Sequence, residues 1–103
     1  VVVFAHVEQA DEPDAARARA LRHALKHVKW LCNKRAIERV VLHSFTHLGA
    51  VSAAPAAARA LLDALAERLR DAGYEACCTP FGRSCEWSLD VHGESLAKVY
   101  KQL

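Results

Sequence analysis

The chain has 103 residues, which is enough for one small hydrophobic core but not for two domains. Apolar residues make up 52% of the chain, and this fraction excludes an intrinsically disordered protein. No apolar run approaches the roughly 20 residues of a membrane-spanning helix, and a net charge of +2 is too small to indicate a partner by itself.

The first predicted elements are a strand and a helix. Residues 1–9 are β-branched and flanked by polar residues, which predicts a strand. The chain starts with Val1, inside this apolar run, and we therefore expect that a preceding strand is missing. Residues 11–36 predict a helix, because acidic residues lie at its start, basic residues lie at its end, and one apolar stripe runs along it. The stripe consists of Leu21, Ala24, Leu25, Val28, Leu31 and Cys32.

A second strand and a second helix follow. Residues 38–45 are short, β-branched and bounded by polar residues, which predicts a strand. Ser52 is the expected N-cap of the next helix, and Pro55 fits its first turn. Gly73 is expected to end this helix. Its predicted buried face consists of Leu61, Leu62, Leu65 and Leu69.

The last third predicts two more strands and a short helix. Residues 74–79 predict a strand, and residues 80–83 predict a turn that contains Pro and Gly. Residues 85–92 alternate between apolar and polar side chains, which predicts a strand, and residues 94–103 predict a closing helix. The element order is therefore β-α-β-α-β-β-α.

This order predicts an α/β fold in a single domain over residues 1–103. The alternating first half predicts parallel strands joined by helical crossovers. The tight turn after the third strand predicts an antiparallel hairpin. We therefore expect a mixed sheet of about four strands with helices packed on it.

Two histidines lie four residues apart near the end of the second predicted strand. A helix would place both histidines on one face, which is the arrangement that helical zinc sites use at this spacing. On a strand they are separated by about 13 Å, at about 3.3 Å per residue. We interpret His43 as a half-buried strand residue with a hydrogen-bond partner. His47 follows the carboxyl end of the strand, where ligands bind in α/β sheets, and is a candidate functional residue.

The cysteines indicate the compartment. Cys77 and Cys78 are adjacent, and the chain contains no C-x-x-C pair, which favours reduced thiols over disulfides. No basic and apolar leader is recognisable in the sequence. We therefore expect a cytoplasmic protein without membrane association.

Three stretches together resemble the N-terminal editing domain of archaeal-type threonyl-tRNA synthetases. They are "VVLHSFTHLG" (40–49), "DAGYEACCTPFG" (71–82) and "HGESLAKVY" (92–100). That family shows Phe-x-His-Leu at a strand end, a Pro-Phe-Gly turn, and Gly-His-Pro-Leu-Ala-Glu at the start of the last helix. The resemblance is specific in order and spacing over residues 35–103, and residues 1–34 are consistent with it.

The resemblance implies a fold like that of D-aminoacyl-tRNA deacylases, a homodimer, and hydrolysis of serine wrongly attached to threonine tRNA. Our first hypothesis is a stand-alone, trans-acting editing factor that cleaves this ester or a related aminoacyl ester. The implied partner is the aminoacylated 3′ end of a tRNA, and we expect no cofactor and no metal. The implied pocket is formed by Ser44, Phe45, Thr46 and His47 from the strand-end loop, and by Phe81, Gly82, Arg83, Ser84 and Cys85 from the turn.

The residue types fit ester hydrolysis, which needs a positioned water molecule and donors for the oxyanion. A neutral His47 can orient the water or the ribose hydroxyl, and backbone N–H groups near Gly82 can donate. Serine and threonine differ by one methyl group, which is worth only about 1–3 kcal/mol of attraction. Rejection of threonine therefore relies on a tight and rigid wall.

The chain departs from the family pattern at two polar positions. Cys85 stands where the family has a lysine, and Lys98 stands where it has a glutamate. Either Arg83 supplies the positive charge, or Cys85 is a nucleophile, or Cys85 binds a metal together with His47. The alternative functions are a non-catalytic module that binds an aminoacyl end, an amino acid or tRNA, and a Cys/His metal-binding protein.

The predicted helix over residues 11–36 is strongly basic. It carries seven of the chain's fourteen Lys and Arg residues, and Trp30 lies between two of its lysines in the sequence. The sequence leaves two interpretations open. The helix has a solvated basic face, or it contacts the phosphates of a tRNA acceptor stem while Trp30 or an arginine stacks on an unpaired base.

Overall fold

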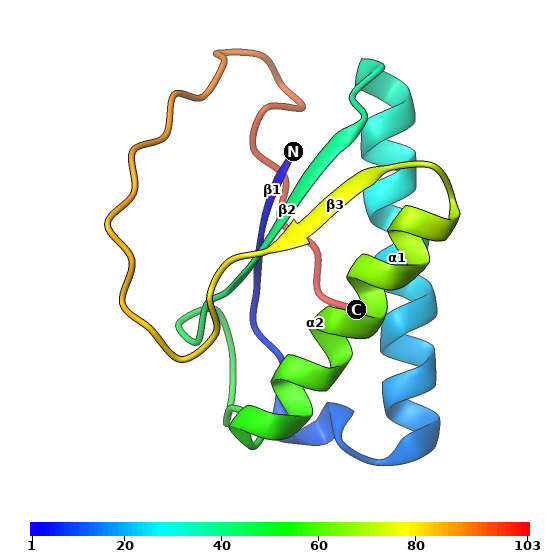
Figure 1. Cartoon of the computed structure of the whole chain (residues 1–103), viewed down its shortest axis with the longest axis vertical. Helices are drawn as coiled ribbons and strands as arrows, with labels where there is room; N and C mark the ends of the chain where they lie inside the picture. Colours follow the sequence, from blue (N-terminus) through cyan, green and yellow to red (C-terminus); the bar gives the residue numbers. More distant parts are fainter.

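The structure, a computed structural model, describes residues 1–103 and contains a three-stranded sheet with two long helices (Figure 1). The strands are parallel and lie in the order β1-β2-β3. Both crossovers run in the same direction across the sheet, and Figure 1 shows both helices on the same face of it. The elements are β1 (Val2–Ala5), a 3₁₀ turn η1 (Gln9–Asp11), α1 (Asp14–Arg35), β2 (Arg39–Ser44), α2 (Pro55–Asp71) and β3 (Glu75–Cys78).

The core lies between the sheet and the two helices. Side chains alternate along the central strand β2, so Val40 and Leu42 point toward the helices and are fully buried. They pack against Cys32 of α1 and Leu69 of α2 in one cluster. All four leucines of the predicted buried face of α2 are buried, which confirms that prediction. Neither helix combines the length and apolarity that crossing a membrane requires.

The ends of α2 follow the predicted signals only in part. Pro55 occupies the first turn, as expected. Gly73 follows the helix with a positive φ of 95°, and its N–H donates to the carbonyl of Arg70 at 2.9 Å. Ser52 does not cap the helix, because the N-cap is Ala54. The Ser52 hydroxyl instead shares a hydrogen bond of 3.0 Å with Nε2 of His6.

The predicted fourth strand does not form. Residues 85–92 make no ladder hydrogen bonds, so the hairpin and the four-stranded sheet are not observed. Alternation gives this segment one apolar side, but a strand also needs a neighbouring edge and a surface to cover. Trp87 contacts the sheet through its ring, which lies 5.5 Å from that of Phe4. Leu89 and Val91 remain 43% and 45% exposed.

The predicted closing helix does not form either. Residues 94–103 contain a turn in which the N–H of Ala97 donates to the carbonyl of Glu94 at 3.0 Å. Short helices gain most of their stability from packing an apolar face, and here only Leu96 and Ala97 are half-buried. The partial burial of these two side chains does not offset the free-energy cost of nucleating a helix.

The four thiols are free and differ in burial. Cys32 is fully buried and Cys78 is half-buried, whereas Cys77 and Cys85 are exposed. Burial raises the pKa of Cys32. Burial, and then the negative charge of Asp63, raises the pKa of the Cys78 thiol. Both groups therefore hold their protons above the ordinary thiol pKa of about 8.5.

We predict that Leu69→Ala lowers the free energy of unfolding by about 2–5 kcal/mol, because it leaves a cavity in the core. Leu89→Ala, a matched change in the irregular segment, is expected to stay within about 0.5 kcal/mol of wild type. Urea denaturation followed by circular dichroism measures both values. Equal destabilisation by the two variants would contradict the placement of residues 85–92 outside the core.

We also predict two fast and two slow thiols in the native protein. Near pH 8, Cys77 and Cys85 should react with a thiol reagent within seconds, because the thiolate is the nucleophile and both are accessible. The other two should react more slowly: the fully buried Cys32 only after unfolding, and the half-buried Cys78 later than Cys77 and Cys85. Because their pKa values are raised in the folded state, their contribution to stability is present below about pH 8.5 and is lost as the pH rises further. Four fast thiols at pH 8 would refute this assignment.

Candidate functional site

The candidate site lies where β2 and β3 end. Both strands are parallel and in register, with Leu42 opposite Cys78, so their carboxyl ends meet at the same end of the sheet. The loop over residues 45–54 leaves β2, and the turn over residues 79–83 leaves β3 (Figure 1). The ladder continues beyond β3, because the N–H of Thr79 donates to the carbonyl of Leu42 at 2.9 Å.

His43 connects the two segments. It is half-buried on the sheet face opposite the helices, and its Nδ1 shares a hydrogen bond of 2.8 Å with Oγ1 of Thr79. The interpretation of His43 as a half-buried strand histidine with a hydrogen-bond partner is therefore confirmed. The bond has a consequence for the site, because it fixes the end of β2 relative to the turn after β3.

An aromatic cluster covers this open face of the sheet. We define it as Phe4, His43, Phe45, His47 and Trp87. Phe4 is central, since its ring lies 5.5 Å from His43, 5.6 Å from Phe45 and 5.5 Å from Trp87. The His47 ring meets Phe45 edge-on at 5.1 Å, and the His47 side chain is exposed. His47 therefore has one ring edge held by an aromatic wall while the residue stays open to solvent.

The loop that carries His47 is held against the segment after β1. The N–H of Gln9 donates to the carbonyl of Val51 at 2.8 Å, and the N–H of Ala53 donates to that of Val7 at 3.0 Å. Between them, Glu8 and Ser52 form an antiparallel bridge. We call this pairing the loop clamp.

Gly49 fits beneath the loop clamp because it has no side chain. A Cβ at this position would collide with the Glu8 carboxylate and would lie 3.4 Å from Nδ1 of His6. The same carboxylate accepts a hydrogen bond from the N–H of Ala50 at 3.4 Å. Sequence reasoning missed His6 and Glu8 as supports of the His47 loop. The glycine two residues after His47 was the one available signal, and it does not say which residue lies above it.

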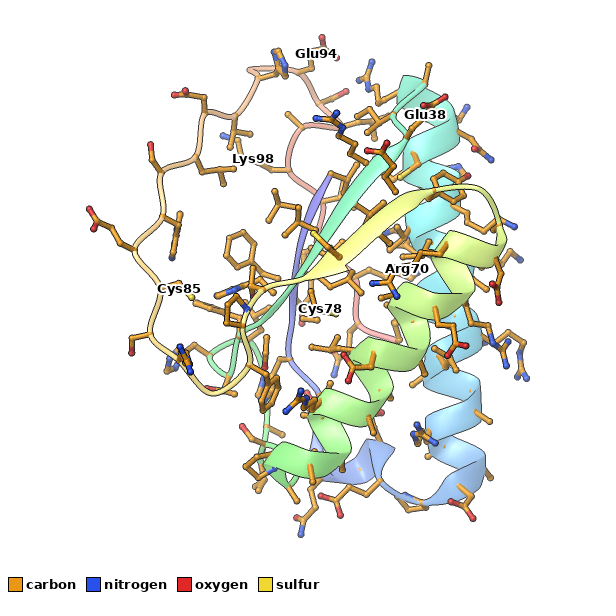
Figure 2. The ribbon with its side chains drawn as sticks, in the orientation of Figure 1. Glu38, Arg70, Cys78, Cys85, Glu94 and Lys98 are labelled. Atoms are coloured by element: carbon orange, nitrogen blue, oxygen red, sulfur yellow. The ribbon has the colours of Figure 1, made fainter.

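The predicted turn after β3 is confirmed. Gly82 has a positive φ of 74°, which favours glycine, and Phe81 packs partly buried against the smaller core cluster. Arg83, Ser84 and Cys85 beyond it are exposed. Figure 2 shows Cys85 on the loop that leads away from the sheet and helices. Its thiol donates only a long hydrogen bond of 3.7 Å to the carbonyl of Arg83.

A cavity of about 610 Å³ lies on the helix side of the same end of the sheet. Ser44 and Phe81 line it, together with Cys78 and the polar face of α2. The Nε of Arg70, which lies near Cys78 in Figure 2, donates to the carbonyl of Ala76 at 2.9 Å. The polar side chains that α2 contributes to the cavity are Arg59, Asp63, Glu67 and Arg70.

The structure thus divides the predicted site residues into three groups. Phe45 and His47 meet in the aromatic cluster, whereas Ser44 and Phe81 line the cavity on the other side of the sheet. The remaining predicted residues, Thr46, Gly82, Arg83, Ser84 and Cys85, are exposed on the two connecting segments. No three His, Cys, Asp or Glu side chains are grouped so that they could hold a metal ion.

This arrangement supplies specific chemical groups. An exposed imidazole can orient water or a hydroxyl, the turn at Gly82 presents backbone N–H groups, and an aromatic wall limits the space beside His47. The hydrogen bond between His43 and Thr79 keeps these parts in register. An imidazole, backbone N–H groups and an aromatic ring are groups that can bind and orient a small polar ligand.

Comparison with known proteins agrees with the motifs at these two strand ends. The chain matches the family model of the archaea-specific editing domain of threonyl-tRNA synthetase over residues 1–103. It is 30% identical over 103 residues to threonine–tRNA ligase of Thermococcus kodakarensis and 34% identical over 103 residues to that of Cenarchaeum symbiosum. A third relative, threonine–tRNA ligase of Methanopyrus kandleri, is 31% identical over 100 residues.

The matches cover most of this chain but little of the relatives. They include 100%, 98% and 96% of the chain, but only 16%, 15% and 16% of the three ligases. The chain therefore spans about one sixth of the length of the relatives it matches. The family match extends over every element described above, including β1 and α1. This chain belongs to the family of archaea-specific editing domains of threonyl-tRNA synthetase.

Proposed function

We propose that this protein is a trans-acting aminoacyl-tRNA deacylase that removes serine from threonine tRNA. The observation that carries the proposal is the position of two family motifs, Phe45-x-His47 and Pro80-Phe81-Gly82, on segments that the bond between His43 and Thr79 joins. Membership of an editing-domain family supports the reaction class. The substrate is the ester between serine and the terminal ribose of the tRNA.

In the proposed mechanism His47 orients the attacking water or the ribose hydroxyl. The imidazole is exposed and meets Phe45 at its edge, so it can approach the ester while its ring orientation is limited. Backbone N–H groups of the turn at Gly82 donate to the oxyanion that forms when water attacks the carbonyl. The bond between the carbonyl carbon and the ribose oxygen then breaks, and this oxygen takes up the proton that the attacking water loses, so the products are free serine and the ribose hydroxyl.

Arg83 takes over the positive charge that the family places two residues further along. The thiol of Cys85 hydrogen-bonds to a backbone carbonyl and not to a histidine, and a thiol nucleophile needs a base or a nearby positive charge to lower its pKa. This contact favours the role of Arg83 over a nucleophilic Cys85. A Cys85→Ser variant separates the two roles, since loss of activity in a folded protein would contradict this assignment.

We further propose that the protein is a homodimer that buries the open face of the sheet. Val2 and Trp87 are 42% and 60% exposed on or beside this face, whereas the opposite face is covered by the helices. Apolar surface of this kind is often an interface. A second copy of the chain would cover Val2 and Trp87, while His47, which lies beyond the end of β2, stays outside the interface and open to the substrate.

We predict that wild-type protein accelerates the decay of Ser-tRNA(Thr) and leaves Thr-tRNA(Thr) intact. His47→Ala should lower this rate by about 10²-fold, the loss expected when a reacting group is no longer held in position. The decay of radiolabelled esters measures both rates. His92→Ala is the matched control, because it removes another exposed histidine outside the site. Decay of neither ester with wild-type protein would contradict hydrolysis and favour a binding module.

We predict a dimer by sedimentation velocity at micromolar concentration. Val2→Glu should shift the protein to a monomer, because the new charge would be buried in the interface. Val51→Glu places the same charge on the loop after β2, where Val51 is 67% exposed, and should leave the dimer intact. A wild-type monomer, or a dimer that tolerates Val2→Glu, would refute this interface.

A further inference from the structure

The charge of this protein is concentrated on one helix. α1 holds seven of the fourteen Lys and Arg residues but only one of the twelve Asp and Glu residues, Asp14. The acidic side chains are spread over the rest of the chain. The small net charge of +2 therefore conceals a strongly basic helix.

The basic side chains of α1 are largely free of carboxylate partners. Only Arg35 forms an ion pair, with Glu94 at 2.8 Å. Elsewhere, Arg39 pairs with Glu75 and Arg59 pairs with Asp63. The unpaired basic residues of α1 are Arg17, Arg19, Arg22, Lys26, Lys29 and Lys34.

The spacing places several of these charges side by side. Arg19, Arg22 and Lys26 are exposed and lie three and four residues apart, which puts them on one face of the helix. Like charges at this spacing repel each other and destabilise a helix. From Arg19 to Lys29, which lies three residues beyond Lys26, this face extends about 15 Å, at about 1.5 Å per residue. A row of this length suits a long anionic ligand rather than a single ion.

A groove beside this row gathers arginines from both helices. It has a volume of about 390 Å³ and lies between α1 and α2. Arg17 and Arg22 of α1 and Arg68 of α2 line it, with Asp14 as the one carboxylate. The planar guanidinium group binds phosphate through two parallel N–H donors, which makes such a cluster suited to a phosphodiester.

An aromatic side chain lies within the same basic helix. Trp30 is 42% exposed, and its ring stacks on His27 with centroids 5.7 Å apart and an interplanar angle of 19°. An exposed indole among cations offers a stacking surface for an unpaired base. The helix thus combines the two features that proteins use to bind single-stranded ends and backbones of RNA.

We propose that α1 and the groove between α1 and α2 bind the sugar-phosphate backbone of the tRNA. This inference rests on the proposed function, which supplies tRNA as the anionic ligand. The surface is distinct from the site at the ends of β2 and β3. In Figure 1 the first turns of α1 lie at the end of the molecule toward which the strands run. A tRNA along α1 would therefore extend toward the loops that hold His47.

The test measures the affinity for deacylated tRNA(Thr) as a function of salt concentration. Arg22→Gln/Lys26→Gln should weaken binding several-fold and reduce the slope of log affinity against log salt by up to about 2, because each phosphate contact releases counterions. The matched control is Arg39→Gln/Lys101→Gln, which removes the same charge outside α1. Its affinity and slope should remain close to those of wild type.

A second measurement tests whether the RNA lies near Trp30 and leaves all basic side chains unmutated. In a Trp87→Phe variant, Trp30 is the one remaining tryptophan, because the chain has two. Addition of tRNA should quench its fluorescence with the same midpoint as binding. Equal losses in both double variants, no loss in the α1 variant, no tRNA binding by wild type, or an unchanged Trp30 signal would each overturn the proposal.

Failure of this inference is distinguishable from failure of the proposed function. Seryl-adenosine carries the ester but no phosphate chain, so its hydrolysis should be the same in wild type and in Arg22→Gln/Lys26→Gln. If wild type hydrolyses neither seryl-adenosine nor Ser-tRNA(Thr) while the α1 variant loses tRNA affinity, the deacylase proposal is contradicted and the RNA-binding surface is supported. If wild type hydrolyses both esters and the α1 variant binds tRNA like wild type, the RNA-binding surface is contradicted and the deacylase proposal is supported. Equal binding of anionic vesicles and tRNA through α1 would contradict specificity for RNA.

Discussion

The burial of alternate side chains of β2 determines the rest of the structure. Val40 and Leu42 face the helices and are enclosed, and the pleat then turns Val41 and His43 to the opposite face. A shift of one residue would exchange the two sets and place an imidazole in the apolar core. The position of the candidate site on the open face is therefore a direct result of the packing on the covered face.

Much of this fold follows from local patterns. The three parallel strands, the apolar face of α2 and its end at Gly73 are visible in the sequence, because each depends on spacing within one segment. The fourth strand and the last helix were also inferred from spacing, but their stability depends on partners from outside the segment. The alternation of apolar and polar side chains over residues 85–92 predicts an apolar face, but it does not show whether another element packs against that face.

The candidate site shows the same division. The half-buried role of His43 and the place of His47 beyond the strand follow from the strand assignment. The loop clamp does not follow from the strand assignment. It pairs residues 7–9 with residues 51–53, and neither segment carries a sequence pattern that predicts this pairing. Nor could the sequence show that Ser44 lines a cavity on the helix side while its neighbour Phe45 lies on the open face.

The fit between Gly49 and Glu8 makes the two positions interdependent, although they lie on different connections of the chain. A Cβ at position 49 would meet the far end of the Glu8 side chain, which can rotate away but would then release the N–H of Ala50. A side chain at position 49 therefore removes the contact between the loop and Glu8, while the backbone pairing of the loop clamp remains. Substitutions at positions 8 and 49 act on the same contact, so their effects on the loop are not additive.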